Sequence, residues 1–415
     1  MIRQFSSWFS FFFFCADQIL FPTSVIKVVL FEDKKGELKV ILNRPKQLNC
    51  LTYEMFCQML KKLGDYEEDP NARLVILKGN GRAFCAGGDV KSVLSFMTTG
   101  HWSFGASFYR KQLNLDYKIG TYKKPVVSII DGIVMGGGAG LSLNSTFRIV
   151  TENTVFAMPE AAIGLFPDCS ASHFLSRLPG FLGEYLGLTG SRLDGAEMVK
   201  YGLATHFVLS KDLASMENAL DSLAASGSVD LSSISKTIHK FVHGPHLKKD
   251  SVYKRLDAIN ECFSKDTAEE ILSSLEELAA KNEEKWIVHA IKSMTSVSPT
   301  SLKIFLRLIR EGRTQNLKEC LVREFRASCH ILRRTVNSDF YEGGRALLVE
   351  KGRQPQWMPS KLDLVSDEMV GKYFCEVDND DDWEPLHLPP RPAPAYFAPM
   401  LSCDARNFLV IYIDL

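Results

Sequence analysis

The stretch that decides the fold spans residues 125–168 and reads PVVSIIDGIVMGGGAGLSLNSTFRIVTENTVFAMPEAAIGLFPD. It starts with a strand-like apolar run, turns at Asp131-Gly132 and continues into the glycines at 136–138. Glycines directly after a buried strand let a ligand approach bare peptide N–H groups, and the free donors of a helix that starts there point the same way. The stretch therefore predicts an anion site or an oxyanion hole.

Two carboxylates close the same stretch. Glu160 and Asp168 each follow a proline, which fixes the local backbone, and the residues between them are otherwise apolar apart from one glycine. We expect at least one of the two side chains to be partly desolvated, which raises the pKa of a carboxyl group. Such a group can act as a base near neutral pH.

A similar order of elements occurs earlier in the chain. The apolar strand predicted at residues 74–77 leads through a turn into Gly87-Gly88, and helix-spaced apolar residues follow. One N–H group from this loop and one from residues 136–138 are predicted to converge on a single oxygen, as donors to an enolate or a tetrahedral oxyanion. The alternative interpretation is a pair of tight turns that need glycine for positive φ.

Composition excludes several classes of function. The chain has 415 residues, of which 46% are apolar, and this predicts roughly two or three domains with a full core. Lys and Arg total 49, as do Asp and Glu, so there is no global basic field and we expect no nucleic-acid partner. The 10 cysteines include no C-x-x-C pair, which favours free thiols and no metal site.

The sequence motifs of other enzyme classes do not fit these residues. The glycines at 136–140 partly imitate a dinucleotide-binding fingerprint, but too few residues separate Gly140 from the next strand for a crossover helix. The chain has no G-x-S-x-G elbow and no phosphate-binding G-x-x-x-x-G-K-[ST] loop. His239, His243 and His246 are interpreted as surface residues, because a Gly-Pro pair breaks the helix before the third histidine.

The chain divides into four predicted segments. Residues 1–24 form an atypical extension whose apolar run is too short to span a bilayer, and both an organellar presequence and a wrongly assigned start remain open. Residues 25–210 form the catalytic core, 211–377 a helical region, and 378–415 an acidic, proline-rich and solvated tail.

Local signals place several elements. An N-terminal hairpin is predicted from residues 25–31 and 38–42, followed by a helix that Thr52 caps. Asp266 with Glu269 predicts a capping box, and Ser298-Pro299 predicts a helix that ends at Gly312.

The motifs at 83–89, 132–141, 156–168 and 174–180 resemble the crotonase superfamily, and together they closely resemble its 3-hydroxyisobutyryl-CoA hydrolase family, especially the plant branch. The resemblance covers residues 25–391 and implies an α/β fold, a crotonase-like spiral of ββα units with a helical C-terminal region. It also implies a coenzyme A thioester substrate whose oxygen meets the N–H groups of Gly88 and Gly137. Glu160 and Asp168 match the catalytic acids, and no cofactor is implied because coenzyme A is part of the substrate.

Three departures from the family pattern accompany this resemblance. Hydratases of the superfamily have a second glutamate where this chain has Gly140, so two-glutamate water addition has lost one partner. Many of the hydrolases have an acid near the position of Gln112, a substrate contact. Cys169-Ser170 replaces the usual Val-Gly, and a serine that needs positive φ would cost about 1 kcal/mol.

The resemblance implies a thioesterase that hydrolyses 3-hydroxyisobutyryl-CoA in valine catabolism. The alternatives are a thioesterase for another short 3-hydroxyacyl-CoA and a weakened crotonase-fold protein that binds acyl-CoA. We expect an acyl-CoA partner and no integral membrane segment, and homo-oligomer formation remains open. The resemblance implies a mitochondrial or peroxisomal location, but the chain lacks a Ser-Lys-Leu-type C-terminal tripeptide, so the compartment remains open.

Overall fold

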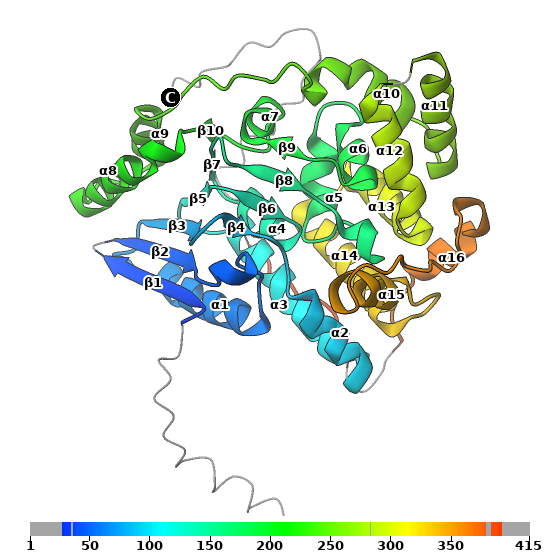
Figure 1. Cartoon of the computed structure of the whole chain (residues 1–415). Coiled ribbons are helices and arrows are strands. Elements are labelled where there is room, and N and C mark those ends of the chain that lie inside the picture. The colour runs from blue at the N-terminus through cyan, green and yellow to red at the C-terminus, as the bar shows by residue number, and fades with distance from the viewer. Residues whose placement is uncertain (1–26, 35, 283, 379–382, 392–415) are drawn as a thin grey trace, which may run out of the picture.

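The computed structural model describes residues 27–391 apart from 35, 283 and 379–382 (Figure 1). The predicted extension at 1–24 and the end of the chain from residue 392 lie outside the described residues.

The chain begins with the predicted hairpin. Strands β1 (Val29–Lys34) and β2 (Glu37–Leu42) pair in antiparallel fashion. Helix α1 (Tyr53–Glu68) follows, and its N-cap Thr52 accepts a hydrogen bond from the Met55 N–H at 3.3 Å, as the sequence predicted. Strand β1 starts and ends later than the predicted 25–31, because residues 27 and 28 precede the strand and the pairing continues to Lys34 opposite Glu37.

Two sheets form the core, and successive turns of the chain contribute one strand to each. The larger sheet has the order β1-β2-β3-β5-β7-β10, and the smaller has the order β4-β6-β8-β9. The further strands of the larger sheet are β3 (Leu74–Gly79), β5 (Val126–Ile130), β7 (Phe147–Val150) and β10 (His206–Phe207). The smaller sheet contains β4 (Ala83–Cys85), β6 (Ile133–Met135), β8 (Val155–Ala157) and β9 (Leu193–Asp194). The predicted spiral of ββα units is therefore confirmed.

Helices cover these sheets. The core contains α2 (Val90–Thr99), α3 (Trp102–Gly120), α4 (Gly137–Leu143), α5 (Ala171–Phe174), α6 (Leu182–Thr189) and α7 (Gly195–Lys200). Helices α8 (Leu213–Ser226) and α9 (Leu231–His239) cover one face of the larger sheet, where Met216 and Ile234 belong to the same buried cluster as Val127. No helix of the described part is long and apolar enough to cross a bilayer.

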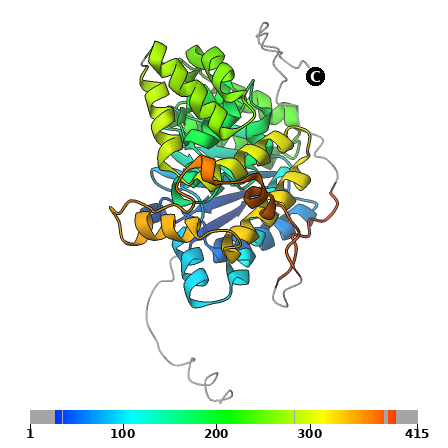
Figure 2. The ribbon, with the colours of Figure 1, turned by 90° about the vertical axis from the view of Figure 1, so that its right-hand side faces the viewer.

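The C-terminal region is helical, as predicted. It consists of α10 (Leu256–Phe263), α11 (Ala268–Lys281), α12 (Lys285–Ser296), α13 (Pro299–Gly312), α14 (Leu317–Arg333), α15 (Asp339–Gly344) and α16 (Asp367–Lys372). Helix α13 starts after its N-cap Ser298 and ends at Gly312, as predicted. Helix α14 packs on α3, and Figure 2 shows the yellow and orange C-terminal elements in front of the blue strands.

Two local predictions are corrected. The capping box of α11 uses Thr267 and Glu270 rather than Asp266 and Glu269, because the Thr267 hydroxyl accepts the Glu270 N–H at 3.2 Å and the helix starts one residue later. The prediction of a solvated tail is only partly right for residues 383–391, most of which are exposed. Leu386 and Leu388 are buried there, and the Tyr117 hydroxyl donates to the Pro389 carbonyl at 3.0 Å.

Candidate active site

Three neighbouring parallel strands bring the predicted site together. Strand β6 pairs in parallel with β4 on one side and with β8 on the other. Because the carboxyl ends of parallel strands meet at one edge of a sheet, the three segments that follow these strands lie together. These segments carry Gly87-Gly88, Gly136-Gly137 and Glu160. The two similar glycine loops of the sequence are therefore neighbours in space.

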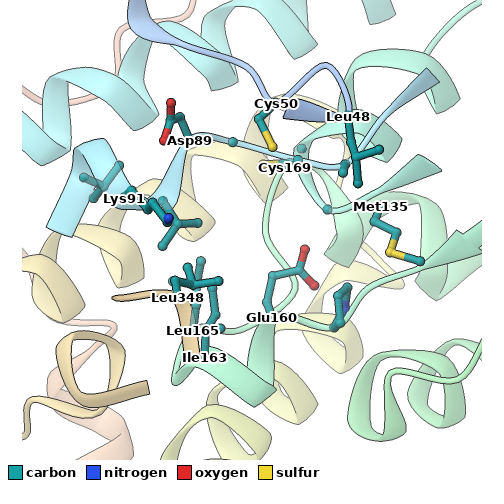
Figure 3. Close-up of a pocket in the computed structure, with 18 of the residues that line it drawn as sticks. Leu48, Cys50, Asp89, Lys91, Met135, Glu160, Ile163, Leu165, Cys169 and Leu348 are labelled. Carbon is teal, nitrogen blue, oxygen red and sulfur yellow. The ribbon is translucent and has the colours of Figure 1, made fainter. Parts of the chain in front are cut away.

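A cavity of about 700 Å³ opens at this edge. All five predicted site residues line it: Gly88, Gln112, Gly137, Glu160 and Asp168. Figure 3 shows the Glu160 carboxylate pointing into the cavity, with the apolar side chains of Ile163, Leu165 and Leu348 gathered on one side. The cavity thus combines an apolar lining with a few convergent polar groups, which is typical of a small-molecule site.

The peptide N–H groups of Gly88 and Gly137 are available to a ligand. Neither donates a hydrogen bond to another group in the described part of the chain. A Cβ atom placed on Gly137 would lie 3.5 Å from the Gly88 nitrogen, so the two donors are close neighbours. Two free donors beside one cavity can share a single oxygen and stabilise negative charge on it.

Gln112 closes the cavity beside these donors. It comes from α3 and is almost fully buried. Its amide nitrogen lies 2.0 Å from the position of a Cβ atom on Gly137, so any side chain at position 137 would displace the Gln112 amide or the backbone. The same amide donates a hydrogen bond to the Cys169 Sγ at 2.8 Å.

Glu160 is placed directly after β8 and next to the Gly136 backbone. Its Oε1 lies 2.6 Å from the position of a Cβ on Gly136, a residue that also has a φ of +51°. The side chain is 6% exposed, and its Oε2 has no hydrogen-bond partner among the described residues. Burial and the nearby Asp168 raise the pKa of Glu160 well above its usual value.

Asp168 lies in a loop with an unusual backbone. Cys169 and Ser170 have φ values of +56° and +69°. The Cys169 thiol donates to the Asp168 Oδ1 at 3.1 Å, while Oδ2 has no partner among the described residues. Burial raises the pKa of Asp168 to about 6, although the hydrogen bond from the thiol lowers it. Both predicted acids are therefore desolvated, as the sequence indicated.

Two further buried acids surround these residues and were missed from the sequence. Asp116 of α3 is 1% exposed, and Glu324 of α14 is fully buried. Burial and the charge of Asp168 raise the pKa of Asp116 well above its usual value, and burial raises the pKa of Glu324 to about 7. No cation contributes to the shifts of these two acids, Glu160 or Asp168. We infer that the four carboxyl groups cannot all be ionised together.

Basic side chains at the rim were also missed. Lys46, Arg82 and Lys91 line the cavity and are exposed. Arg44 lines it too, but its guanidinium lies 3.5 Å from a carboxylate oxygen of Asp89. Arg82 and Lys91 flank the Gly87-Gly88 loop in sequence, but Arg44 and Lys46 lie far upstream of it, and only the fold shows that the four side chains face one opening.

The departures at Gly140 and Ser170 have structural explanations. A Cβ on Gly140 would lie 2.6 Å from the Cβ and carbonyl oxygen of Cys169, so this loop excludes a glutamate there. The Ser170 hydroxyl accepts a hydrogen bond from the Asn144 side chain at 2.8 Å. The serine therefore gains a buried hydrogen bond that offsets part of its strained φ.

Comparison with known proteins identifies the family. The model of the enoyl-CoA hydratase/isomerase family matches residues 38–374. A relative from Arabidopsis thaliana named probable 3-hydroxyisobutyryl-CoA hydrolase 3 is 52% identical over 363 residues, which is 88% of this chain and 95% of the relative. The chain belongs to the 3-hydroxyisobutyryl-CoA hydrolase family.

Other family relatives extend the comparison. The mitochondrial 3-hydroxyisobutyryl-CoA hydrolase of Xenopus tropicalis is 41% identical over 343 residues, 82% of this chain and 87% of the relative. A solved carnitinyl-CoA dehydratase from Mycobacterium thermoresistibile matches with a TM-score of 0.78 and 32% identity, covering 87% of this chain and 98% of that one. Because that neighbour is named a dehydratase, the shared fold alone does not separate hydrolysis from dehydration.

Proposed function

We propose that this chain hydrolyses 3-hydroxyisobutyryl-CoA to 3-hydroxyisobutyrate and coenzyme A. The observation that carries the proposal is the pair of free N–H groups of Gly88 and Gly137 beside the buried Glu160, in one cavity. Thioester hydrolysis places negative charge on the carbonyl oxygen in the transition state, and two such donors stabilise that charge. The names of the relatives supply the acyl group and support a role in valine catabolism.

The charges at the cavity support coenzyme A as the carrier. The exposed side chains of Lys46, Arg82 and Lys91 form no ion pair with an acid in the described ranges of the chain. The phosphates of coenzyme A can pair with them while the pantetheine arm leads the thioester to Gly88 and Gly137. The reaction then needs no separate cofactor, because coenzyme A is part of the substrate.

Glu160 carries the chemical step in one of two routes. It attacks the thioester carbon to form an anhydride that water then cleaves, or it takes a proton from a water that attacks the carbon. In both routes the carbon–sulfur bond breaks, one water is consumed, and its proton ends on the thiol. In the general-base route the OH of water ends on the acyl group. In the anhydride route it ends on the carbon that water attacks, either that of the acyl group or that of Glu160, which then leaves one of its own oxygens on the acyl group. Asp168 accepts a hydrogen bond from the substrate hydroxyl or assists the proton transfer.

Hydration of an enoyl-CoA is disfavoured by the same geometry. Position 140 carries no side chain, and Cys169 occupies the space a side chain would need. Glu160 therefore works with Asp168, on the loop after it, rather than with a second glutamate on α4.

A thiol-release assay on a panel of coenzyme A thioesters tests the proposal. We expect 3-hydroxyisobutyryl-CoA to be the preferred substrate and Glu160→Gln to lower turnover ~100-fold or more, with binding largely retained. Label in Glu160 after a single turnover in ¹⁸O-water would establish the anhydride route with cleavage at the Glu160 carbon, because the general-base route places label only in the product acid. The proposal would be refuted if the protein hydrated an enoyl-CoA faster than it released coenzyme A from 3-hydroxyisobutyryl-CoA, or if Glu160→Gln were fully active.

A second candidate is a weakened protein that binds acyl-CoA without efficient turnover. Gln112, in place of the acid found in many hydrolases, and the strained Ser170 favour it. Tight thioester binding in calorimetry, together with thiol release no faster than that of Glu160→Gln, would support this candidate instead.

The relatives named mitochondrial support a mitochondrial location over a peroxisomal one. Organelle fractionation of cells that express the full chain tests the compartment, and light scattering tests whether the protein forms a homo-oligomer.

A further inference from the structure

We propose that Glu324 positions Asp168 for catalysis, and that the C-terminal helices are thereby part of the catalytic machinery. The inference rests on the proposed function. Glu324 lies on α14, more than 150 residues after Asp168 in the sequence. It touches the loop that carries Asp168 rather than the cavity, so it is a positioning residue.

Three hydrogen bonds connect Glu324 to this loop. Its Oε2 accepts the Ser170 N–H at 2.7 Å, and its Oε1 accepts the Ser172 N–H at 2.9 Å and the Ser172 hydroxyl at 2.6 Å. Both carboxylate oxygens are therefore used. These partners lie two and four residues after Asp168, so a shift of the Glu324 head group moves the backbone that carries Asp168.

The loop needs such a clamp because its backbone is strained. Cys169 and Ser170 both have positive φ, a conformation that residues other than glycine adopt at a cost. The Asn144 side chain, at the end of α4, also holds the Ser170 hydroxyl. The loop is therefore tied on one side to the helix that starts at Gly137 and on the other to α14.

Burial of the Glu324 carboxylate lowers the stability of the fold, so stability alone does not explain why a carboxylate lies here. It is fully buried, and no Lys, Arg or His of the described residues forms an ion pair with it. The acids Asp116, Glu160 and Asp168 share its surroundings. An apolar residue would remove this burial cost, whereas only a carboxylate can accept three donors from the loop with two oxygens.

Glu324→Gln tests the proposal because it keeps the shape and places an amide NH₂ against one of the backbone N–H donors. We expect kcat for thiol release to fall by ~10- to 100-fold with KM changed less than about twofold, because a displacement near 1 Å at a reacting group can cost ~100-fold. Glu319→Gln is the matched control. Glu319 lies on the same helix, is exposed and forms a capping box in which glutamine also functions, so wild-type kinetics are expected.

Ser172→Ala provides a milder variant if Glu324→Gln does not fold. It removes one of the three bonds and should lower kcat roughly two- to fivefold at unchanged KM. A folded Glu324→Gln with wild-type kcat, or a change in KM alone, would overturn the inference, as would wild-type kcat in Ser172→Ala.

Amide hydrogen exchange measures the loop directly, so it can test this inference independently of the proposed function. If the wild type releases no thiol from any thioester, the proposed function fails. Faster exchange in Glu324→Gln confined to the peptide that contains Ser170 and Ser172 would still support the clamp, whereas unchanged exchange there would overturn it.

Discussion

Replacing Gly137 by alanine is the sharpest test of the proposed oxyanion site. The added Cβ would lie 2.0 Å from the Gln112 amide nitrogen and 3.5 Å from the Gly88 nitrogen. An ordinary contact between such atoms is about 3.5 Å, so Gln112 or the Gly137 backbone must move by more than 1 Å. Movement of the Gly137 backbone displaces one donor, and movement of Gln112 breaks its hydrogen bond to Cys169 and changes the cavity wall beside the donors.

The expected loss follows from that displacement. Removal of one oxyanion donor lowers kcat by about 100- to 1000-fold, and a misplacement near 1 Å has an effect of similar size. Thiol release from 3-hydroxyisobutyryl-CoA, followed with a chromogenic thiol reagent, should show this loss mainly in kcat. Thermal unfolding of the variant checks that the chain remains folded.

Two further glycine variants complete the test. A Cβ on Gly88 would lie 3.2 Å from the Phe108 ring, which can yield by a few tenths of an ångström, so Gly88→Ala should lose roughly tenfold or less. Gly371 on α16 has nothing within 4 Å of its Cβ position, so Gly371→Ala should behave as wild type. If Gly137→Ala keeps more than a tenth of wild-type kcat, or loses less than Gly88→Ala, the assignment of the donors is refuted.

Three more predictions follow from the charges of the site. Burial raises the pKa of Asp168 to about 6 and that of Glu160 well above its usual value, and the proposed chemistry uses both ionised forms. We therefore expect kcat/KM to fall as pH drops, with Asp168 taking up its proton near pH 6 and Glu160 at its own raised pKa, and Asp168→Asn to be nearly inactive at every pH. Burial also raises the pKa of Asp116, so the folded state holds a proton that the unfolded state has released. The cost of this proton to the free energy of unfolding grows with pH. Asp116→Asn should therefore raise the melting temperature more at pH 8 than at pH 5. Lys46→Glu should raise KM roughly fivefold for coenzyme A thioesters, with the effect weakened by 0.5 M salt and absent for pantetheine thioesters that lack phosphates.

The fold and the main site were predictable because their signals are local. Gly88, Gly137 and Glu160 each follow a short apolar strand, and glycine or proline marks the point where the strand ends. Parallel pairing of β4, β6 and β8 then brings these segments to one edge. The residue types suggested a role for these residues, which stays a prediction, and the fold supplied their proximity.

Asp116 and Glu324 could not be assigned in the same way because their burial depends on two distant helices. Glu324 lies in the stripe formed by Cys320, Leu321, Phe325 and Ser328, which α14 buries. The sequence alone therefore shows that an acid lies within a buried stripe. The role of this acid depends on which loop the helix contacts, and that contact joins residues 154 positions apart in the chain.

Replacing Ser170 by glycine tests the two candidate functions against each other. The substitution removes the backbone strain that, in the second candidate, would weaken catalysis. Glycine relieves about 1 kcal/mol at a φ of +69°, but it loses the hydrogen bond from Asn144 and gains entropy in the unfolded chain, each about 1 kcal/mol. One N–H of the Asn144 amide keeps its bond to the Gly140 carbonyl at 2.8 Å, while the other loses the Ser170 hydroxyl as its partner.

The two losses exceed the relief by about 1 kcal/mol, so Ser170→Gly should melt somewhat below the wild type but turn over within about twofold of it. Ser170→Ala keeps the strain and loses the hydrogen bond, and it should therefore be destabilised by about 1 kcal/mol. A tenfold or larger gain of kcat in Ser170→Gly would contradict this reasoning, because it would mean that the serine holds Asp168 out of place. The natural chain would then be better described as a weakened acyl-CoA binder than as an efficient thioesterase.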